Sequence, residues 1–264
     1  METLNVSKKH IVPEVSVITT QPVEQAHKLK QALEGQNIAF YSMPMIRTEA
    51  YKLNDSIRNT LKKLNNYSHL IFISKNGVNA FFQLLNEAGV SFPENIKTAV
   101  IGQTTASTLK KLHRKADFVN PGQTSVEFLD ALQNGLINKK DKVLMALGNL
   151  APTRMQEQLS KITTVDRLNV YQTIGLTDYD DKMMQNIRDD RYGLLVFSSP
   201  SAFQNFYQFY KIEKSIAPLR IVSIGKITTQ AIQNITGAQI YTAREAGVSG
   251  LKNEIIHYFK NKIK

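Results

Sequence analysis

Two stretches, HLIFISKNGVNAFF at residues 69–82 and LLVFSSPSAFQNFY at residues 194–207, carry the same pattern. Each begins with an aliphatic run typical of a buried strand and turns at one or two serines. Each then continues with aromatic residues at helical spacing. A strand that leads directly into a helix is typical of an α/β protein, in which helices cover a parallel sheet.

The likeness between the two halves extends beyond these stretches. VIGQTTASTL at 100–109 resembles SIGKITTQAI at 223–232, and segment 17–33 resembles segment 144–159, all at an offset of about 125 residues. We therefore predict two similar lobes, each a parallel sheet flanked by helices in the flavodoxin-like manner, joined by a two-stranded hinge. A helix is expected at 25–33, and strands at 15–19, 70–74, 98–101, 143–146, 194–197 and 221–224.

The repeated units need not coincide with the folded lobes. Each unit opens as strand, helix and strand, and then passes through an extended segment, at 42–49 and at 170–177, where Pro44 disfavours a helix or a central strand. If the chain crosses between lobes at both segments, residues 1–44 and 174–264 form one lobe and 48–170 the other, with crossovers at 45–47 and 171–173. Two contiguous domains divided near 138–141 are the simpler alternative.

Composition excludes several classes of protein. The 264 residues include no cysteine, so disulfide frameworks and thiolate sites are excluded, and 42% hydrophobic with 21% charged residues is ordinary for a globular protein. The net charge of +11, spread evenly along the chain, suggests either a polyanionic ligand or simply a basic surface. No apolar run is long enough to span a membrane, and residues 1–10 do not read as a signal peptide, so we expect a cytoplasmic protein.

Familiar catalytic motifs are missing. The sequence has no Walker-type phosphate loop, no Gly-x-Gly-x-x-Gly after the first strand and no Gly-x-Ser-x-Gly elbow. We expect no metal site, because the histidines lack ligand spacing. We expect His27 and His257 to lie on helices at or near the surface. The five histidines are His10, His27, His69, His113 and His257.

Four polar turns follow predicted strands, at 74–77, 102–105, 198–201 and 225–228. Ligands bind at the carboxyl ends of parallel strands, and Ser, Thr or Asn at such turns cap the helix that follows. The free N–H groups and the positive end of each helix suit a carboxylate or a phosphate. Ordinary capping without a ligand is the alternative at any single turn. The side chains concerned are Ser74, Lys75, Thr105, Ser198, Ser199, Ser201, Lys226 and Thr228.

Tyr171 is the candidate for proton transfer. It ends a predicted strand at the second crossover, where a side chain can overlook the space between two lobes. A phenol is protonated at neutral pH and can donate its proton to a leaving group. The alternative is a packing tyrosine at a domain junction.

Taken in order, these motifs resemble the uroporphyrinogen-III synthase family over almost the whole chain. The family's Phe-Thr-Ser strand end resembles 72–74 and 197–201, its Gly-x-x-Thr-Ala turn matches 102–106 and less fully 225–229, and its Val-Tyr-x-Thr crossover matches 170–173. A looser Pro-to-Leu turn resembles 121–129. The chain departs from the family at three positions, with Gln21 and Leu147 where arginine is common and Ile73 where threonine is common.

The resemblance implies a cofactor-free enzyme of tetrapyrrole biosynthesis. It would close the linear tetrapyrrole hydroxymethylbilane into a ring, inverting ring D and releasing water. Tyr171 would be the proton donor, and Ser74, Thr105, Ser199, Ser201 and Thr228, with nearby N–H groups, would hold the substrate's carboxylates. Lys75 and Lys226 would add positive charge. We expect a monomer that contacts the preceding pathway enzyme transiently and binds neither nucleic acid nor membrane.

Two other classes share this architecture. A two-lobed sensor module would bind a small molecule without catalysis, but it usually carries an export signal or a helix-turn-helix, and the sequence indicates neither. A flavodoxin-like electron carrier would need aromatic loops to stack on flavin, and the chain has no tryptophan.

Overall fold

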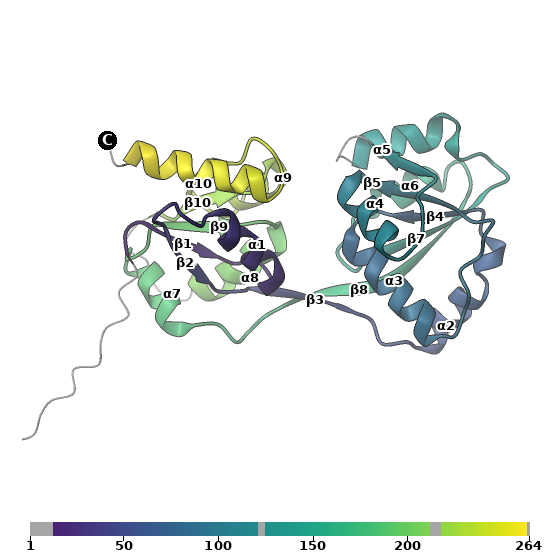
Figure 1. The fold of residues 1–264 in the computed structure, drawn as a ribbon, viewed down its shortest axis with the longest axis horizontal. Helices are drawn as coiled ribbons and strands as arrows, with labels where there is room; N and C mark the ends of the chain where they lie inside the picture. Colours follow the sequence, from purple (N-terminus) through teal and green to yellow (C-terminus); the bar gives the residue numbers. More distant parts are fainter. Residues whose placement is uncertain (1–12, 121–124, 212–217, 263–264) are drawn as a thin grey trace, which may run out of the picture. The chain divides into compact units, whose positions relative to one another are not determined.

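The computed structural model describes residues 13–120, 125–211 and 218–262, which fall into two compact units (Figure 1). Unit 1 comprises Met1–Arg47 and Ile174–Lys264, and unit 2 comprises Thr48–Thr173. Of the positions considered above, residues 1–10, including His10, and residues 121–124 of the Pro-to-Leu turn lie outside the described residues.

Unit 1 contains a five-stranded parallel sheet in the order β11-β10-β9-β1-β2. Its strands are β1 (Ser16–Thr19), β2 (Ala39–Ser42), β9 (Leu194–Phe197), β10 (Arg220–Ser223) and β11 (Gln239–Thr242). Its helices are α1 (Val23–Ala32), α7 (Asp181–Arg188), α8 (Pro200–Tyr210), α9 (Lys226–Gln233) and α10 (Val248–Lys262).

Unit 2 is built on the second sheet, in the order β3-β8-β7-β4-β5-β6. Its strands are β3 (Ile46–Ala50), β4 (His69–Phe72), β5 (Lys97–Ile101), β6 (Phe118–Asn120), β7 (Lys142–Gly148) and β8 (Thr164–Gly175). Its helices are α2 (Asp55–Lys62), α3 (Lys75–Glu87), α4 (Gly102–Lys111), α5 (Ser125–Ala131) and α6 (Arg154–Leu159), with short turns η1 (Leu64–Asn66) and η2 (Leu132–Leu136).

Each sheet is covered by helices on both faces. Because successive side chains of a strand point to opposite sides, each strand contributes to two separate cores. In unit 1, Ile18 and Leu195 pack with α7, α8 and α9, whereas Val17 and Leu194 pack with α1 and α10. In unit 2 the same alternation divides the strands between a core under α2, α3 and α4 and a core under α5 and α6. Burial on both faces explains why the central strands are continuous aliphatic runs.

The two sheets repeat one topology. Matching β7, β8, β4, β5 and β6 to β1, β2, β9, β10 and β11 gives the same strand order in both units. The predicted α/β fold with duplicated parallel sheets is therefore confirmed. The chain passes from unit 1 to unit 2 within β3 and returns within β8, and these two strands are hydrogen-bonded neighbours.

The predicted strands and the first helix lie within one or two residues of the observed elements. The predicted side-chain caps are confirmed at two turns and wrong at the other two. Ser74 and Ser199 cap α3 and α8, whereas Ile101 and Gly225, which precede α4 and α9, make no side-chain cap. At α4 the first residue is Gly102 with φ of 71°, so glycine geometry rather than a hydroxyl makes that turn.

Helices of the described segments fall short of the length and apolar character that a bilayer-spanning helix needs. His27 and His257 lie on α1 and α10 and are exposed, as predicted.

Candidate functional site

Tyr171 and Ser74 meet at the carboxyl end of the unit 2 sheet. Tyr171 lies on β8, and its hydroxyl is 3.2 Å from Ser74 Oγ, just after β4. Ser74 Oγ also accepts a hydrogen bond of 3.1 Å from the Gly77 N–H and so caps α3. The helix cap therefore places a hydroxyl against the candidate proton donor, although the two residues are far apart in sequence.

Gly148 makes the space in which the Tyr171 ring lies. The pairing of β7 with β8 shifts register between Leu147 and Gly148, so Gly148 pairs with Tyr171. A β-carbon at position 148 would lie 2.4 Å from Tyr171 Cζ and 2.8 Å from its hydroxyl oxygen. Such bulges re-aim a side chain, and only glycine fits beneath this one.

The turn after β7 is tied down around Tyr171. Arg167 donates hydrogen bonds of 2.9 Å to the carbonyl oxygens of Gly148 and Ala151. Asn149 donates its backbone N–H to the Tyr171 carbonyl at 3.1 Å, and its side-chain oxygen accepts from the Thr173 N–H at 2.9 Å. The backbone of Tyr171 and of the residues beneath its ring is thus fixed from both strands.

A pocket of about 180 Å³ opens beside Tyr171 within unit 2. It is polar, and its one ionisable carboxylate is that of Glu49, which accepts a 3.1 Å hydrogen bond from the Gln172 amide. The pocket is lined by Thr48, Glu49, Ala50, Asn76, Asn79, Ala80, Gln83 and Tyr171.

The other predicted residues divide between the units. In unit 2, Lys75 opens α3 and is half-buried, whereas Thr105 lies inside α4 with 4% of its surface exposed. In unit 1, Ser199 Oγ accepts from the Ala202 N–H at 3.2 Å and lies 3.2 Å from Ser201 Oγ. Unit 1 also holds the half-buried Ser198, the exposed Lys226 at the start of α9, and Thr228, which is 3% exposed.

The structure brings together Ser74 with Tyr171 and Ser199 with Ser201. Thr105 and Thr228 are buried in the first turns of their helices, so they offer a ligand less surface than the serines do. Sequence reasoning did not single out Glu49, Asn149 or Arg167, and it gave no role to Gly148. A glycine at the end of a strand often marks a bulge or a place where another group approaches the backbone closely. Gly148 was therefore the one signal in the sequence that could have indicated this packing of the Tyr171 ring.

Positions 21 and 147, where the family often has arginine, carry no exposed side chain here. Gln21 is 3% exposed, and its side-chain oxygen accepts a 3.2 Å hydrogen bond from the Thr19 hydroxyl. Leu147 is 1% exposed and packs in the core under α5 and α6. Neither residue offers a charged group to an anion.

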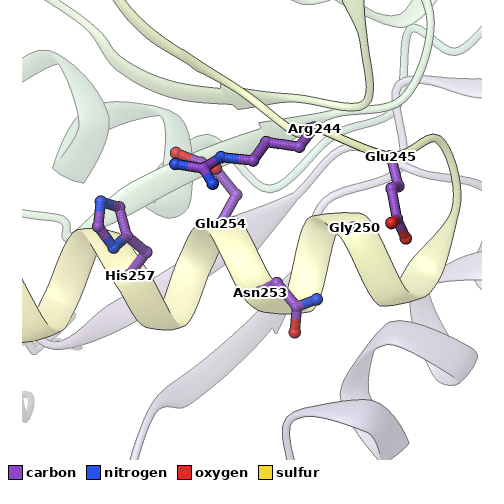
Figure 2. Close-up of a pocket in the computed structure, with 6 residues that line it drawn as sticks. All are labelled: Arg244, Glu245, Gly250, Asn253, Glu254 and His257. Carbon is purple, nitrogen blue, oxygen red and sulfur yellow. The ribbon is translucent and has the colours of Figure 1, made fainter.

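A second pocket, of about 430 Å³, lies along α10 of unit 1 (Figure 2). The Arg244 guanidinium lies beside the Glu254 carboxylate, and His257 follows one turn along the helix. None of the predicted site residues lines this pocket, and its two carboxylates oppose its arginine. It is lined by Arg244, Glu245, Gly250, Asn253, Glu254 and His257. Over the part of the chain that the structure describes, no three acidic or histidine side chains gather as metal ligands.

The model of the uroporphyrinogen-III synthase HemD family matches residues 27–253. The chain belongs to the uroporphyrinogen-III synthase family. The resemblance seen in the sequence is thereby confirmed.

Two relatives agree with this assignment, and a solved structure shares the fold. The chain is 24% identical over 223 residues to the porphyrin biosynthesis protein HemD of Ruminiclostridium josui, a match that covers 81% of this chain but 43% of that protein. It is 29% identical over 171 residues to the uroporphyrinogen-III synthase of Proteus mirabilis, covering 62% of this chain and 83% of that one. A mutant uroporphyrinogen III synthase from Thermus thermophilus has the same fold, with a TM-score of 0.66, 13% identity and coverage of 94% and 98%.

Proposed function

We propose that the chain converts hydroxymethylbilane into uroporphyrinogen III, closing the ring with inversion of ring D and release of water. The family match supports this class of reaction. The pairing of Tyr171 with Ser74 beside a polar pocket supports the proposed position of the site. No comparison favours the sensor module or the electron carrier.

Tyr171 acts as the proton donor to the departing hydroxyl of ring A. The carbon–oxygen bond breaks, the oxygen takes the phenolic proton, and water leaves. Ring A is then an electrophilic azafulvenium cation, still carrying its N–H and balanced by the phenolate, and the substituted carbon of ring D attacks it. The resulting spiro intermediate fragments and recloses with ring D inverted. For Tyr171 to donate toward substrate, Ser74 must donate its own O–H to the phenol oxygen, and this bond then stabilises the phenolate as it forms.

The polar turns hold the substrate's carboxylates. Ser74, Ser199 and Ser201 are half-buried and lie at helix starts, where backbone N–H groups and the helix dipole favour an anion. Because the Ser74 O–H donates to Tyr171, the carboxylate at that turn is held by backbone N–H groups. Lys75, Ser198 and Lys226 lie in the same turns. Thr105 and Thr228 stay predictions, and their burial makes them the weaker two. A net charge of +11 suits a ligand with eight carboxylates.

The test is a coupled assay. Hydroxymethylbilane generated enzymatically is supplied to the purified protein, the product is oxidised, and the uroporphyrin isomers are separated. Spontaneous closure yields isomer I, so isomer III formed in proportion to added protein is the expected result. Isomer I alone would exclude the proposed reaction.

We further propose that the protein acts as a cytoplasmic monomer without a cofactor and receives its substrate by transient contact with the enzyme that makes it. Gel filtration at assay concentration, cell fractionation and activity after dialysis against a chelator test these points. A rise in isomer III yield when both enzymes are present, beyond that expected from substrate supply, would support the contact.

A further inference from the structure

The pocket beside Tyr171 has an unexpected charge for a protein of this composition. The chain carries a net charge of +11, yet among the described residues this pocket is lined by no lysine or arginine and by one carboxylate, that of Glu49. The remaining polar groups are the Tyr171 phenol, the Thr48 hydroxyl and three primary amides. A site built to hold substrate carboxylates would not place an acidic group at its wall.

The lining groups come from elements that hold them in place. Asn76, Asn79 and Gln83 lie three and four residues apart on α3, so they share one face of that helix, and the small Ala80 on the same face leaves room between them. Glu49 lies on β3, where the amide of Gln172 on the neighbouring strand donates to its Oε1 at 3.1 Å. Gln172 directly follows Tyr171, so the carboxylate is tied to the strand that carries the phenol.

The chemistry of the substrate offers two kinds of group to such a pocket. Its carboxylates accept hydrogen bonds and are repelled by Glu49. Its four pyrrole N–H groups only donate, and a carboxylate and amide oxygens are acceptors for them. The amides and hydroxyls can serve either kind of group, so Glu49 decides: it accepts from a ring nitrogen and repels a carboxylate, and the pocket favours ring nitrogens.

We infer that this pocket is a subsite for the pyrrole ring that loses its hydroxyl, with Glu49 accepting the N–H of that ring. The inference rests on the proposed function and deepens it. When the carbon–oxygen bond breaks and the oxygen takes the Tyr171 proton, the ring is left with a positive charge shared by its nitrogen. The Glu49 carboxylate stabilises that charge, while the phenolate balances it until ring closure returns a proton.

Charge substitutions at Glu49 test the subsite. In the isomer III assay, Glu49→Gln is expected to lower kcat about tenfold with KM changed by less than about twofold, because the lost interaction strengthens in the transition state. Glu49→Lys is expected to lower kcat further, because a cation there opposes the positive charge that forms on the ring. Glu94→Gln, an exposed glutamate of unit 2 outside the pocket lining, is the matched control and should behave as wild type.

The outcomes separate the two proposals. Glu49 is exposed, so both variants should fold, which a thermal midpoint within a few degrees of wild type would verify. If the wild-type protein forms isomer III and Glu49→Gln keeps full kcat, the subsite is wrong and the proposed function stands. A Glu49→Lys variant whose kcat equals or exceeds that of Glu49→Gln would also overturn the subsite, because a cation there should oppose the positive charge that forms on the ring. A wild-type protein that yields only isomer I overturns both.

Discussion

In the proposed reaction, the phenol of Tyr171 supplies the proton that the departing hydroxyl takes. Tyr171→Phe keeps the ring over Gly148 and removes only the hydroxyl that lies 3.2 Å from Ser74. We expect kcat for isomer III to fall about ten- to a hundredfold, at the lower end of what loss of a general acid costs. Isomer analysis of the coupled reaction at saturating substrate measures this.

Tyr67→Phe is the control for that substitution. The Tyr67 hydroxyl donates a 2.7 Å hydrogen bond to Asp166, outside the pocket, and burial with this bond raises the pKa of Tyr67 well above its usual range. Its loss should cost about 1 kcal/mol of stability and leave kcat unchanged. A Tyr171→Phe enzyme as fast as the Tyr67→Phe enzyme would remove the proton-donor role.

His69 predicts a pH dependence of stability. Burial lowers the pKa of His69 below its usual value of 6.5, against the opposing charge of Asp141, whose oxygen lies 3.5 Å from Nδ1. Below about pH 6.5 the unfolded chain takes up a proton that folded His69 resists, so the free energy of unfolding falls as the pH drops. Above that pH the residue is neutral in both states and has no effect.

Urea unfolding of wild type and His69→Gln across a range of about pH 5 to 8 measures this contribution. The wild type should lose more stability than the variant between about pH 7 and pH 5. Equal slopes for the two proteins would show that His69 titrates alike when folded and unfolded.

The junction of β7 and β8 can be tested by a substitution at Gly148. The nearest atoms to a methyl group at position 148 all belong to the Tyr171 side chain, which can move, so Gly148→Ala should displace the phenol without unfolding the strand pair. We expect kcat to fall about as far as in Tyr171→Phe, with the thermal midpoint lowered by a few degrees at most. Gly237→Ala, where a β-carbon meets open space, is the control.

The double variant shows whether both changes act through one group. If Gly148 matters because it seats Tyr171, Gly148→Ala combined with Tyr171→Phe should be no slower than the slower single variant. Multiplied losses in the double variant would mean that Gly148 affects the reaction by another route.

The strands that sequence reasoning located are the central ones, and the reason is burial. β1, β4, β5, β7, β9 and β10 lie inside their sheets, so both faces of each strand are largely buried and the sequence shows an apolar run. β6 and β11 are edge strands with partly exposed side chains, and no apolar run marks them. The crossover predicted at 171–173 is the end of a longer strand, β8. This strand extends from Thr164 to Gly175, because its first half pairs with β7.

From the sequence, the site could be predicted only where it depends on residues that are close together in the chain. Ser74 and Ser199 are recognisable because a cap is a local feature, encoded within four residues. The contact between Ser74 and Tyr171 joins residues 97 apart in sequence, and the Arg167 bonds to the β7 turn depend on strand register. Single-sequence patterns carry no information on either.

The charge of the whole molecule predicts a dependence on ionic strength. A protein of net charge +11 attracts a substrate with eight carboxylates over a distance that salt shortens, with a screening length near 10 Å at about 0.1 M. Raising the salt concentration from about 50 to about 300 mM should increase KM roughly threefold or more and leave kcat almost unchanged. Steady-state rates across a salt series test this, and a constant KM would show that long-range charge plays little part.

Because unit 2 is inserted into unit 1, the two units cannot be completed in the order in which their first residues appear. β1 lies between β2 and β9, and β9 begins only at Leu194, whereas all of Thr48–Thr173 has been synthesised by then. On the ribosome, β1 and β2 can pair only with each other, and the edge of β1 that β9 will cover stays open while the later-starting unit 2 acquires its complete sheet. The emerging chain therefore has its greatest need of chaperone protection at its first two strands.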